Sequence, residues 1–155
     1  MDSHIKGEEF VSAISKMFSE DIPFNKLLGL KVQSISPEHV KVSFEMRHEF
    51  IGNYQREMLH GGTISSVIDA TGGLAAFVGT IKRLQVKTLE ATLMRSFSLS
   101  TIDMRVDFLR PGLGKRFVAT AYPLRTGKKV VVTRIELHNE QNDLIAVGTG
   151  SYRVV

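Results

Sequence analysis

Two consecutive glycines and an aspartate stand close together in a stretch of apolar and small residues. His60-Gly61-Gly62 precedes a run of apolar residues at helical spacing, and Asp69 lies nine positions after His60. Glycines at a helix start let another group approach the backbone. The first amides of a helix are unpaired and lie at the positive end of its dipole, so Gly61 and Gly62 can donate to an oxygen that gains negative charge. The pattern indicates an oxyanion hole, and a simple tight turn is the alternative.

Asp69 breaks the pattern of its segment, because aspartate is a poor helix former and is seldom buried. At about 100° per residue, Asp69 shares one stripe of the helix with small or polar residues. These residues are Ser65, Ser66, Gly72, Gly73 and Ala76. Such a stripe admits a close neighbour, either a second copy of the helix or a ligand. We expect Asp69 to belong to a site, and a solvent-facing or structural carboxylate is the alternative.

Hydrophobic periodicity predicts the helices that would position these residues. Apolar spacing predicts an amino-terminal helix over about 8–18, a short helical piece over 22–28 and the long helix over 60–79. The segment 80–99 keeps helical spacing up to Phe97, which favours a second helix with loops around it.

Alternation of apolar and polar residues predicts the strands. They are expected over 30–36, 39–46, 101–108, 116–125, 129–139 and 144–155. In the strand over 101–108, Ile102, Met104, Val106 and Phe108 should face one way, toward the core. Short connections between the last four strands predict an antiparallel meander. The fold class is α+β, with an antiparallel sheet and one long apolar helix.

Length and composition predict a single domain over 1–155 with an amino-terminal helix. The chain has no cysteine, which excludes disulfides, thiolate nucleophiles and cysteine-ligated metals. Apart from His60, the histidines are His4, His39, His48 and His138, and their spacing is not that of metal ligands. No apolar run approaches the ~20 residues that cross a bilayer, and no signal peptide is evident. We therefore expect a cytoplasmic protein with no metal and no membrane span.

The basic residues are concentrated in the middle of the sequence. Residues 80–134 hold twelve Lys or Arg against three Asp or Glu, which suggests an anionic partner. A phosphorylated small molecule and a nucleic acid both fit. Single-strand binding surfaces interleave basic and exposed aromatic residues, whereas Phe108 and Phe117 lie in patterns typical of a core. The prediction is therefore that no nucleic acid binds.

Two motifs together resemble a known family. The His-Gly-Gly of residues 60–62, followed after six residues by Asp69, and the later Val-Asp-Phe-Leu-Arg-Pro-Gly of residues 106–112 are similar to those of hotdog-fold acyl-CoA thioesterases, with the phenylacetyl-CoA type as the nearest branch. The resemblance covers roughly residues 23–155. It implies a hotdog fold, in which the sheet wraps the long helix. It also implies a homodimer or homotetramer with active sites at a dimer interface.

The resemblance also implies roles for particular residues. His60 and Gly61 would polarise the thioester carbonyl, and Asp69 from the other protomer would attack it or activate a water. No cofactor is then needed, because coenzyme A is part of the substrate. Where such enzymes often have Asn or Gln six residues before the histidine, this chain has Tyr54, so its neighbours Asn53 and Gln55 are the candidates.

Three further residues are candidate substrate contacts. The family commonly has Ser or Thr at the start of the strand after the central helix, which points to Ser100 and Thr101. Arg110 is one of several basic residues at strand ends that can reach a coenzyme phosphate, the others being Lys115, Arg116, Arg125, Lys128 and Lys129. A non-catalytic acyl-CoA-binding module on the same fold is the alternative function.

Overall fold

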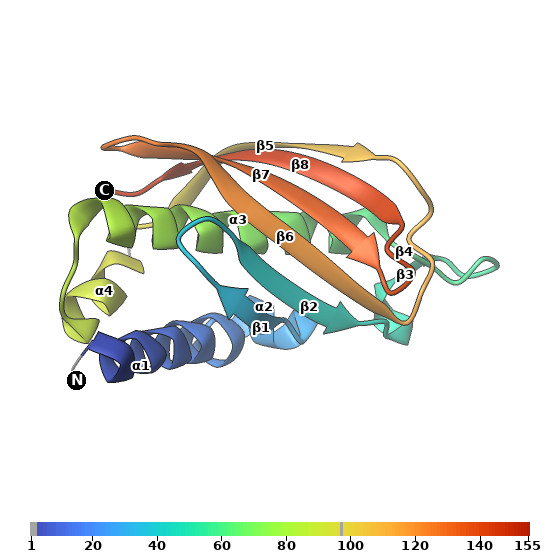
Figure 1. Ribbon diagram of the computed structural model, residues 1–155. Coiled ribbons are helices and arrows are strands. Elements are labelled where there is room, and N and C mark those ends of the chain that lie inside the picture. Colours follow the sequence, from blue (N-terminus) through green and yellow to red (C-terminus); the bar gives the residue numbers. More distant parts are fainter. Residues whose placement is uncertain (1–2, 97) are drawn as a thin grey trace.

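A computed structural model describes residues 3–96 and 98–155 (Figure 1). The helices are α1 (Ser3–Lys16), α2 (Pro23–Leu28), α3 (Gly61–Leu84) and α4 (Leu89–Ser96), with a π-turn at Met17–Asp21 and a 3-10 turn at His48–Phe50. The strands are β1 (Lys31–Ile35), β2 (Val40–Glu45), β3 (Ile51–Asn53), β4 (Met58–Leu59), β5 (Ser100–Phe108), β6 (Arg116–Thr126), β7 (Val130–Asn139) and β8 (Leu144–Arg153).

Six strands form one antiparallel sheet in the order β1-β2-β6-β7-β8-β5. The sheet curves around α3, which confirms the predicted hotdog fold (Figure 1). The predicted four-strand meander is wrong in one respect: β5 pairs with β8 and not with its chain neighbour β6. The connection from β5 to β6 therefore crosses the sheet, and β5 becomes an edge strand.

The core lies between α3 and the concave face of the sheet. Strand β7 alternates buried and part-buried side chains, because one face of the sheet packs on the helix and the other does not. The rings of Phe44 and Phe117 stack within this core, with their centroids 5.2 Å apart. Helix α3 is long and apolar enough to cross a membrane, but 67% of its most apolar window is buried inside the fold. It is therefore the core helix that the sheet encloses.

Several predicted boundaries change. The long helix extends to Leu84, so the segment 80–99 divides between its last turn and the short α4. The segment 48–59, for which no helix or strand is predicted, contains the small β3–β4 hairpin. The amino-terminal helix begins at Ser3 and passes into the π-turn. Phe97 lies outside the described residues.

The burial predicted for the apolar residues of 101–108 is wrong at its two ends. Ile102 is 56% exposed and Phe108 is 55% exposed. Both lie on β5, which has a strand partner on one side only among the described residues. The expectation that Phe108 belongs to the core therefore fails, while Phe117 is fully buried as expected.

Candidate active site

His60 caps the helix that begins immediately after it. The Nδ1 atom of His60 accepts a hydrogen bond from the Gly62 N–H at 2.8 Å, and the His60 carbonyl accepts from Thr63 N–H. Because Nδ1 accepts, the proton of the neutral ring is on Nε2. Within the described part of the chain, the Gly61 N–H has no acceptor. Of the two predicted oxyanion donors, Gly61 is therefore available and Gly62 is already occupied.

The β3–β4 hairpin fixes the position of His60. The His60 N–H donates to the Phe50 carbonyl at 2.7 Å, and a Cβ on Gly52 would lie only 2.7 Å from the His60 Cα. Glycine is therefore needed at position 52. The candidates Asn53 and Gln55 are exposed on this hairpin, and the Asn53 side chain accepts a hydrogen bond from the Arg56 N–H in its own turn.

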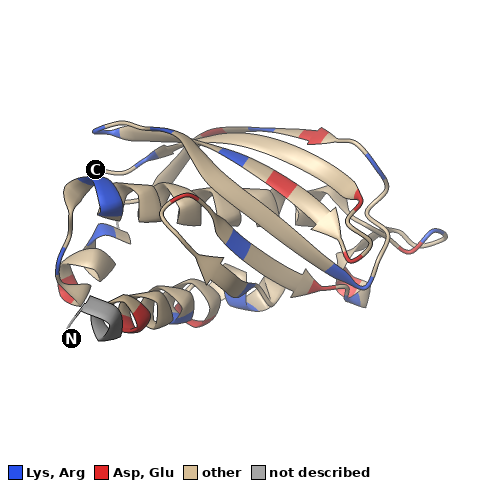
Figure 2. Cartoon of the chain, viewed as in Figure 1, with Lys and Arg blue, Asp and Glu red and all other residues tan. Residues whose placement is uncertain are grey.

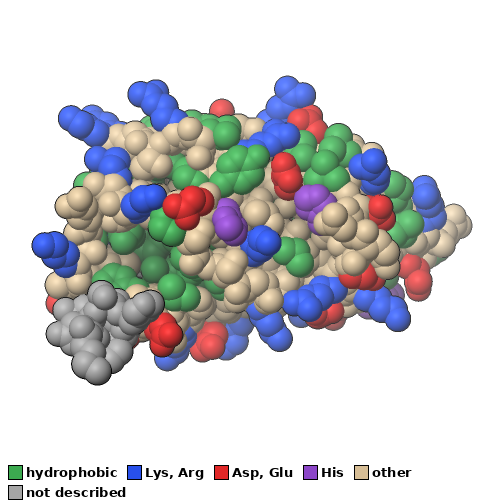
Figure 3. Space-filling view, viewed as in Figure 1, with side chains coloured by type: hydrophobic (Ala, Val, Ile, Leu, Met, Phe, Trp, Pro, Cys, Tyr) green, Lys and Arg blue, Asp and Glu red, His purple; other side chains and the backbone are tan. Residues whose placement is uncertain are grey.

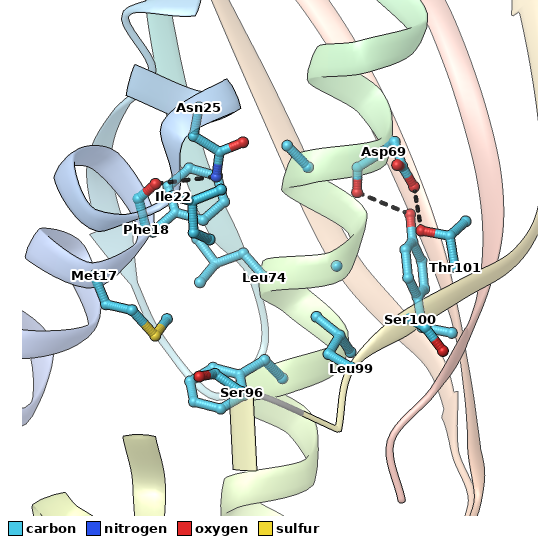
Figure 4. A pocket seen from close by; sticks show the side chains of 14 residues that line it. Met17, Phe18, Ile22, Asn25, Asp69, Leu74, Ser96, Leu99, Ser100 and Thr101 are labelled. Carbon is cyan, nitrogen blue, oxygen red and sulfur yellow. Dashed lines mark hydrogen bonds between the residues drawn. The ribbon is translucent and has the colours of Figure 1, made fainter. Parts of the chain in front are cut away.

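Asp69 is half-buried and is held by side chains from two strands (Figure 4). Its Oδ1 accepts a hydrogen bond from the Thr101 hydroxyl at 2.9 Å, and its backbone carbonyl accepts one from the Tyr152 hydroxyl at 3.0 Å. Thr101 is one of the predicted contact residues. Tyr152 was not predicted, since nothing in a strand pattern shows which residue a buried hydroxyl will reach.

The Tyr152 hydroxyl stays protonated and so remains a hydrogen-bond donor to the Asp69 carbonyl. Burial raises the pKa of the Tyr152 phenol well above its usual range, and the nearby negative charge of Asp69 raises it further. The ring is completely buried against Gly72 and Gly150, where a Cβ would lie 2.3 Å and 2.6 Å from the tyrosine oxygen. The two glycines thus make room for the phenol, which stays protonated at neutral pH.

A cavity of about 200 Å³ opens beside Asp69 (Figure 4). Asp69, Ser100 and Thr101 form a polar group on its lining, and Gly73 lies on its α3 side. Asn25 and Ser96 also line it, but their side chains donate to the Phe18 and Leu93 carbonyls. The other lining residues are mainly apolar, and several belong to the amino-terminal segment. The structure therefore brings together Asp69 and both hydroxyl candidates of β5 at one end of an apolar pocket.

His60 and Asp69 do not share a cavity within one chain. His60 and Gly62 line a second cavity of about 400 Å³, together with Phe24, Leu27 and Arg47. Gly61 and Asp69 are eight residues apart on α3, which is about 12 Å along the helix axis. Within one chain, the two groups therefore do not face the same cavity.

The basic residues predicted to reach a phosphate are not all close together. Figure 2 shows Lys and Arg on several elements, and on the face seen in Figure 3 they are interspersed with acidic side chains. Arg110, Lys115 and Arg116 lie near the start of β6, and Lys128 and Lys129 follow its end. The strand between them spans about 33 Å. Arg110 donates to the Leu144 carbonyl at 3.0 Å, which leaves its charge exposed. Among the described residues, no three of His, Cys, Asp and Glu are grouped as metal ligands would be.

Comparison with known proteins gives a consistent result. Residues 57–146 match the family model described as the thioesterase superfamily. The chain is 37% identical to the medium/long-chain acyl-CoA thioesterase YigI of Escherichia coli K12, over 99% of both chains. A Shewanella oneidensis structure related to the thioesterase superfamily superposes with a TM-score of 0.90, at 42% identity over 98% of this chain and 99% of that one. A Syntrophus aciditrophicus structure, provisionally described as a thioesterase, has a TM-score of 0.86 at 54% identity over 99% and 100%.

Proposed function

The chain belongs to the thioesterase superfamily, and we propose that it hydrolyses acyl-CoA to a free acid and coenzyme A. The observation that carries this proposal is the Asp69 carboxylate, held by Thr101 at the polar end of an apolar cavity. The name of the Escherichia coli relative supports an aliphatic acyl chain of medium or long length over an aromatic one. The proposed chemistry needs a base or nucleophile and hydrogen-bond donors, and no cofactor.

The complete site is proposed to form between two protomers. Strand β5 has an unpaired edge in the described part of the chain, and the exposed Ile102 and Phe108 lie on it. A ring carbon of Phe108 would lie 3.4 Å from a Cβ on Gly61, so this edge adjoins the start of α3. In a twofold dimer, contacts are reciprocal. Pairing of two such edges would set Asp69 of each protomer opposite Gly61 of the other.

In this arrangement the Gly61 N–H donates to the thioester oxygen as it becomes negative. A water oxygen adds to the carbonyl carbon, and its proton passes to the partner's Asp69. Collapse of the intermediate breaks the carbon–sulfur bond, and the departing thiolate takes up the proton as coenzyme A leaves. Direct attack by the carboxylate, followed by hydrolysis of the anhydride, gives the same products. Heavy-oxygen water in a single turnover labels the Asp69 carboxylate only in the second route, when the water attacks the Asp69 carbonyl carbon of the anhydride.

The experiment that tests the function is turnover of an acyl-CoA panel by the wild type and by Asp69→Asn. Asparagine keeps the shape of the side chain and its ability to accept from Thr101, but removes the charge. We expect the wild type to turn over aliphatic acyl-CoAs and the variant to lose about 10²–10⁴-fold in kcat. Unchanged kcat in Asp69→Asn would contradict the assigned role. Tight acyl-CoA binding by the wild type without turnover would instead establish the binding module.

A further inference from the structure

The cavity beside Asp69 is walled by a part of the chain that precedes the family match. The matched residues are 57–146, whereas Met17, Phe18, Ile22 and Asn25 all line this cavity. Phe18 is 3% exposed, and Met17 packs partly buried against the main core. The amino-terminal segment is therefore a structural part of the pocket.

A π-turn presents Met17 and Phe18 to the cavity. The Ile22 N–H donates to the Met17 carbonyl at 3.2 Å, which is the wider hydrogen bond of a π-turn. The buried Asn25 side chain donates to the Phe18 carbonyl at 3.0 Å and so holds α2 against this turn (Figure 4). These two hydrogen bonds, together with apolar packing, hold this side of the cavity in place.

The polarity of the cavity matches one kind of ligand. Asp69 and Thr101 mark the end where the thioester would react, and Leu74, Phe77 and Leu99 line apolar parts of the same space. Phe77 lies eight residues after Asp69 on α3, about 12 Å farther along the helix. A chain with a reactive polar head and an alkyl tail fits this gradient.

We propose that the π-turn segment Met17–Asn25 forms the wall of the acyl-chain pocket, and that Met17 limits the chain length accepted. This inference rests on the proposed thioesterase function and adds the residues that select the substrate. A dry cavity of ~150 Å³ holds a benzene molecule. The 200 Å³ found beside Asp69 therefore corresponds to on the order of eight chain carbons.

Met17 is the residue of choice for testing the limit, because its side chain is flexible and only partly buried. Met17→Ala removes the Cγ, Sδ and Cε atoms and lengthens the pocket, while Met17→Phe fills it. The measurement is kcat/KM for octanoyl-CoA and dodecanoyl-CoA. We expect the dodecanoyl-to-octanoyl ratio to rise on the order of tenfold in Met17→Ala and to fall in Met17→Phe.

Val11→Ala is the matched control, since Val11 is an apolar residue of α1 that is 39% exposed and does not line the cavity. Its ratio should equal that of the wild type, and thermal melts confirm that each variant is folded. An unchanged ratio in both Met17 variants would overturn the proposal while leaving the hydrolase intact.

Equilibrium binding of the same two acyl-CoAs to Asp69→Asn, with and without Met17→Ala, separates the two claims. A shift toward the longer chain in binding supports the pocket even if the wild type shows no turnover. In that case only the proposed hydrolase function fails. If Met17→Ala does not change the relative affinities for the two acyl-CoAs, the pocket assignment is wrong, whatever the catalytic result.

Discussion

The capping role of His60 determines which backbone amide at the start of α3 is left without an acceptor among the described residues. Because Nδ1 accepts the hydrogen bond from the Gly62 N–H, this ring nitrogen is not available to a ligand. The Nε2–H, on the other side of the ring, takes no part in the cap. A Cβ on Gly62 would lie 2.9 Å from Nδ1, so glycine is required there for the cap to form. Gly61 has the remaining free donor of the three residues, as far as the described chain extends.

Gly61→Pro tests this donor with little cost to the helix. Gly61 is the first helical residue, a position that tolerates proline, and His60 already has the extended backbone that precedes proline (φ −66°, ψ 138°). The variant lacks only the N–H, and we expect kcat to fall about 10²–10³-fold. Gly61→Ala keeps the N–H, with its Cβ 3.4 Å from Phe108, and should stay within a few-fold of the wild type. Equal kcat in the proline and alanine variants would exclude Gly61 as a donor.

Tyr152→Phe tests the support beneath Asp69. Loss of the hydrogen bond to the Asp69 carbonyl should lower the free energy of unfolding by about 0.5–1.5 kcal/mol at pH 8. The folded state raises the pKa of Tyr152 above the value of about 10 in the unfolded chain. The phenol's contribution is therefore fully present below pH 10 and is lost as the pH rises beyond it.

Urea unfolding of both proteins between pH 8 and 11 measures this effect. The wild type should lose its advantage over Tyr152→Phe progressively above pH 10. If the difference in free energy of unfolding between the two proteins stays constant from pH 8 to 11, the pKa of Tyr152 is not raised by folding, and the account of this phenol is wrong.

At the residue scale, broken local rules are what makes Asp69 and the glycine pair candidate site residues in the sequence. Thr101, a predicted substrate contact, donates a hydrogen bond to Asp69, while the roles of these residues in a reaction stay predictions. Tyr152 and Met17 were missed, because each reaches the site through tertiary packing that no local pattern records.

Helix α3 has two adjacent glycines whose surroundings differ. A Cβ on Gly72 would lie 2.3 Å from the Tyr152 oxygen and 2.9 Å from Ile135 and Thr133 side-chain atoms. A Cβ on Gly73 would meet nothing closer than a Leu99 carbon at 3.5 Å, an ordinary contact. The same substitution should therefore have opposite effects at the two positions.

Gly73→Ala should raise the free energy of unfolding by up to about 1 kcal/mol, because alanine favours the helix and fits the space. For a chain of this size that corresponds to roughly 2–4 °C in Tm. Gly72→Ala should lower the free energy by about 1–3 kcal/mol, since the methyl group displaces Tyr152. Calorimetry of the two variants measures both effects. If Gly72→Ala is as stable as Gly73→Ala, the close packing of Tyr152 against Gly72 is contradicted.

The sequence predicts the elements in which apolar residues recur at a regular spacing. It does not predict features that depend on contacts with neighbouring elements. Helix α3 and strands β6 to β8 have long regular patterns and lie near their expected positions. Strand β5 was found, but its place beyond β8 and the exposure of Ile102 and Phe108 depend on the sheet order. The π-turn and the β3–β4 hairpin are too short for a periodic signal.

For the whole molecule, the central claim is that one protomer supplies half of a site. Asp69, in the proposed acyl cavity, is about 12 Å along α3 from the Gly61 amide, whose neighbours His60 and Gly62 line a separate cavity. The β5 edge offers the surface for a second copy, and its exposed apolar side chains favour burial. The basic residues at the two ends of β6 are about 33 Å apart, so we expect at most one of the two groups to contact the phosphates of a bound coenzyme.

Complementation between two inactive variants tests this claim most directly. Asp69→Asn and Gly61→Pro are co-expressed with different tags, and the mixed dimer is purified through both. If the site is shared, each mixed dimer has one intact site and one doubly defective site, so its kcat per dimer should be about half that of the wild type. If each chain holds its own site, the mixed dimer will be as inactive as the two parents, and that result would contradict the account.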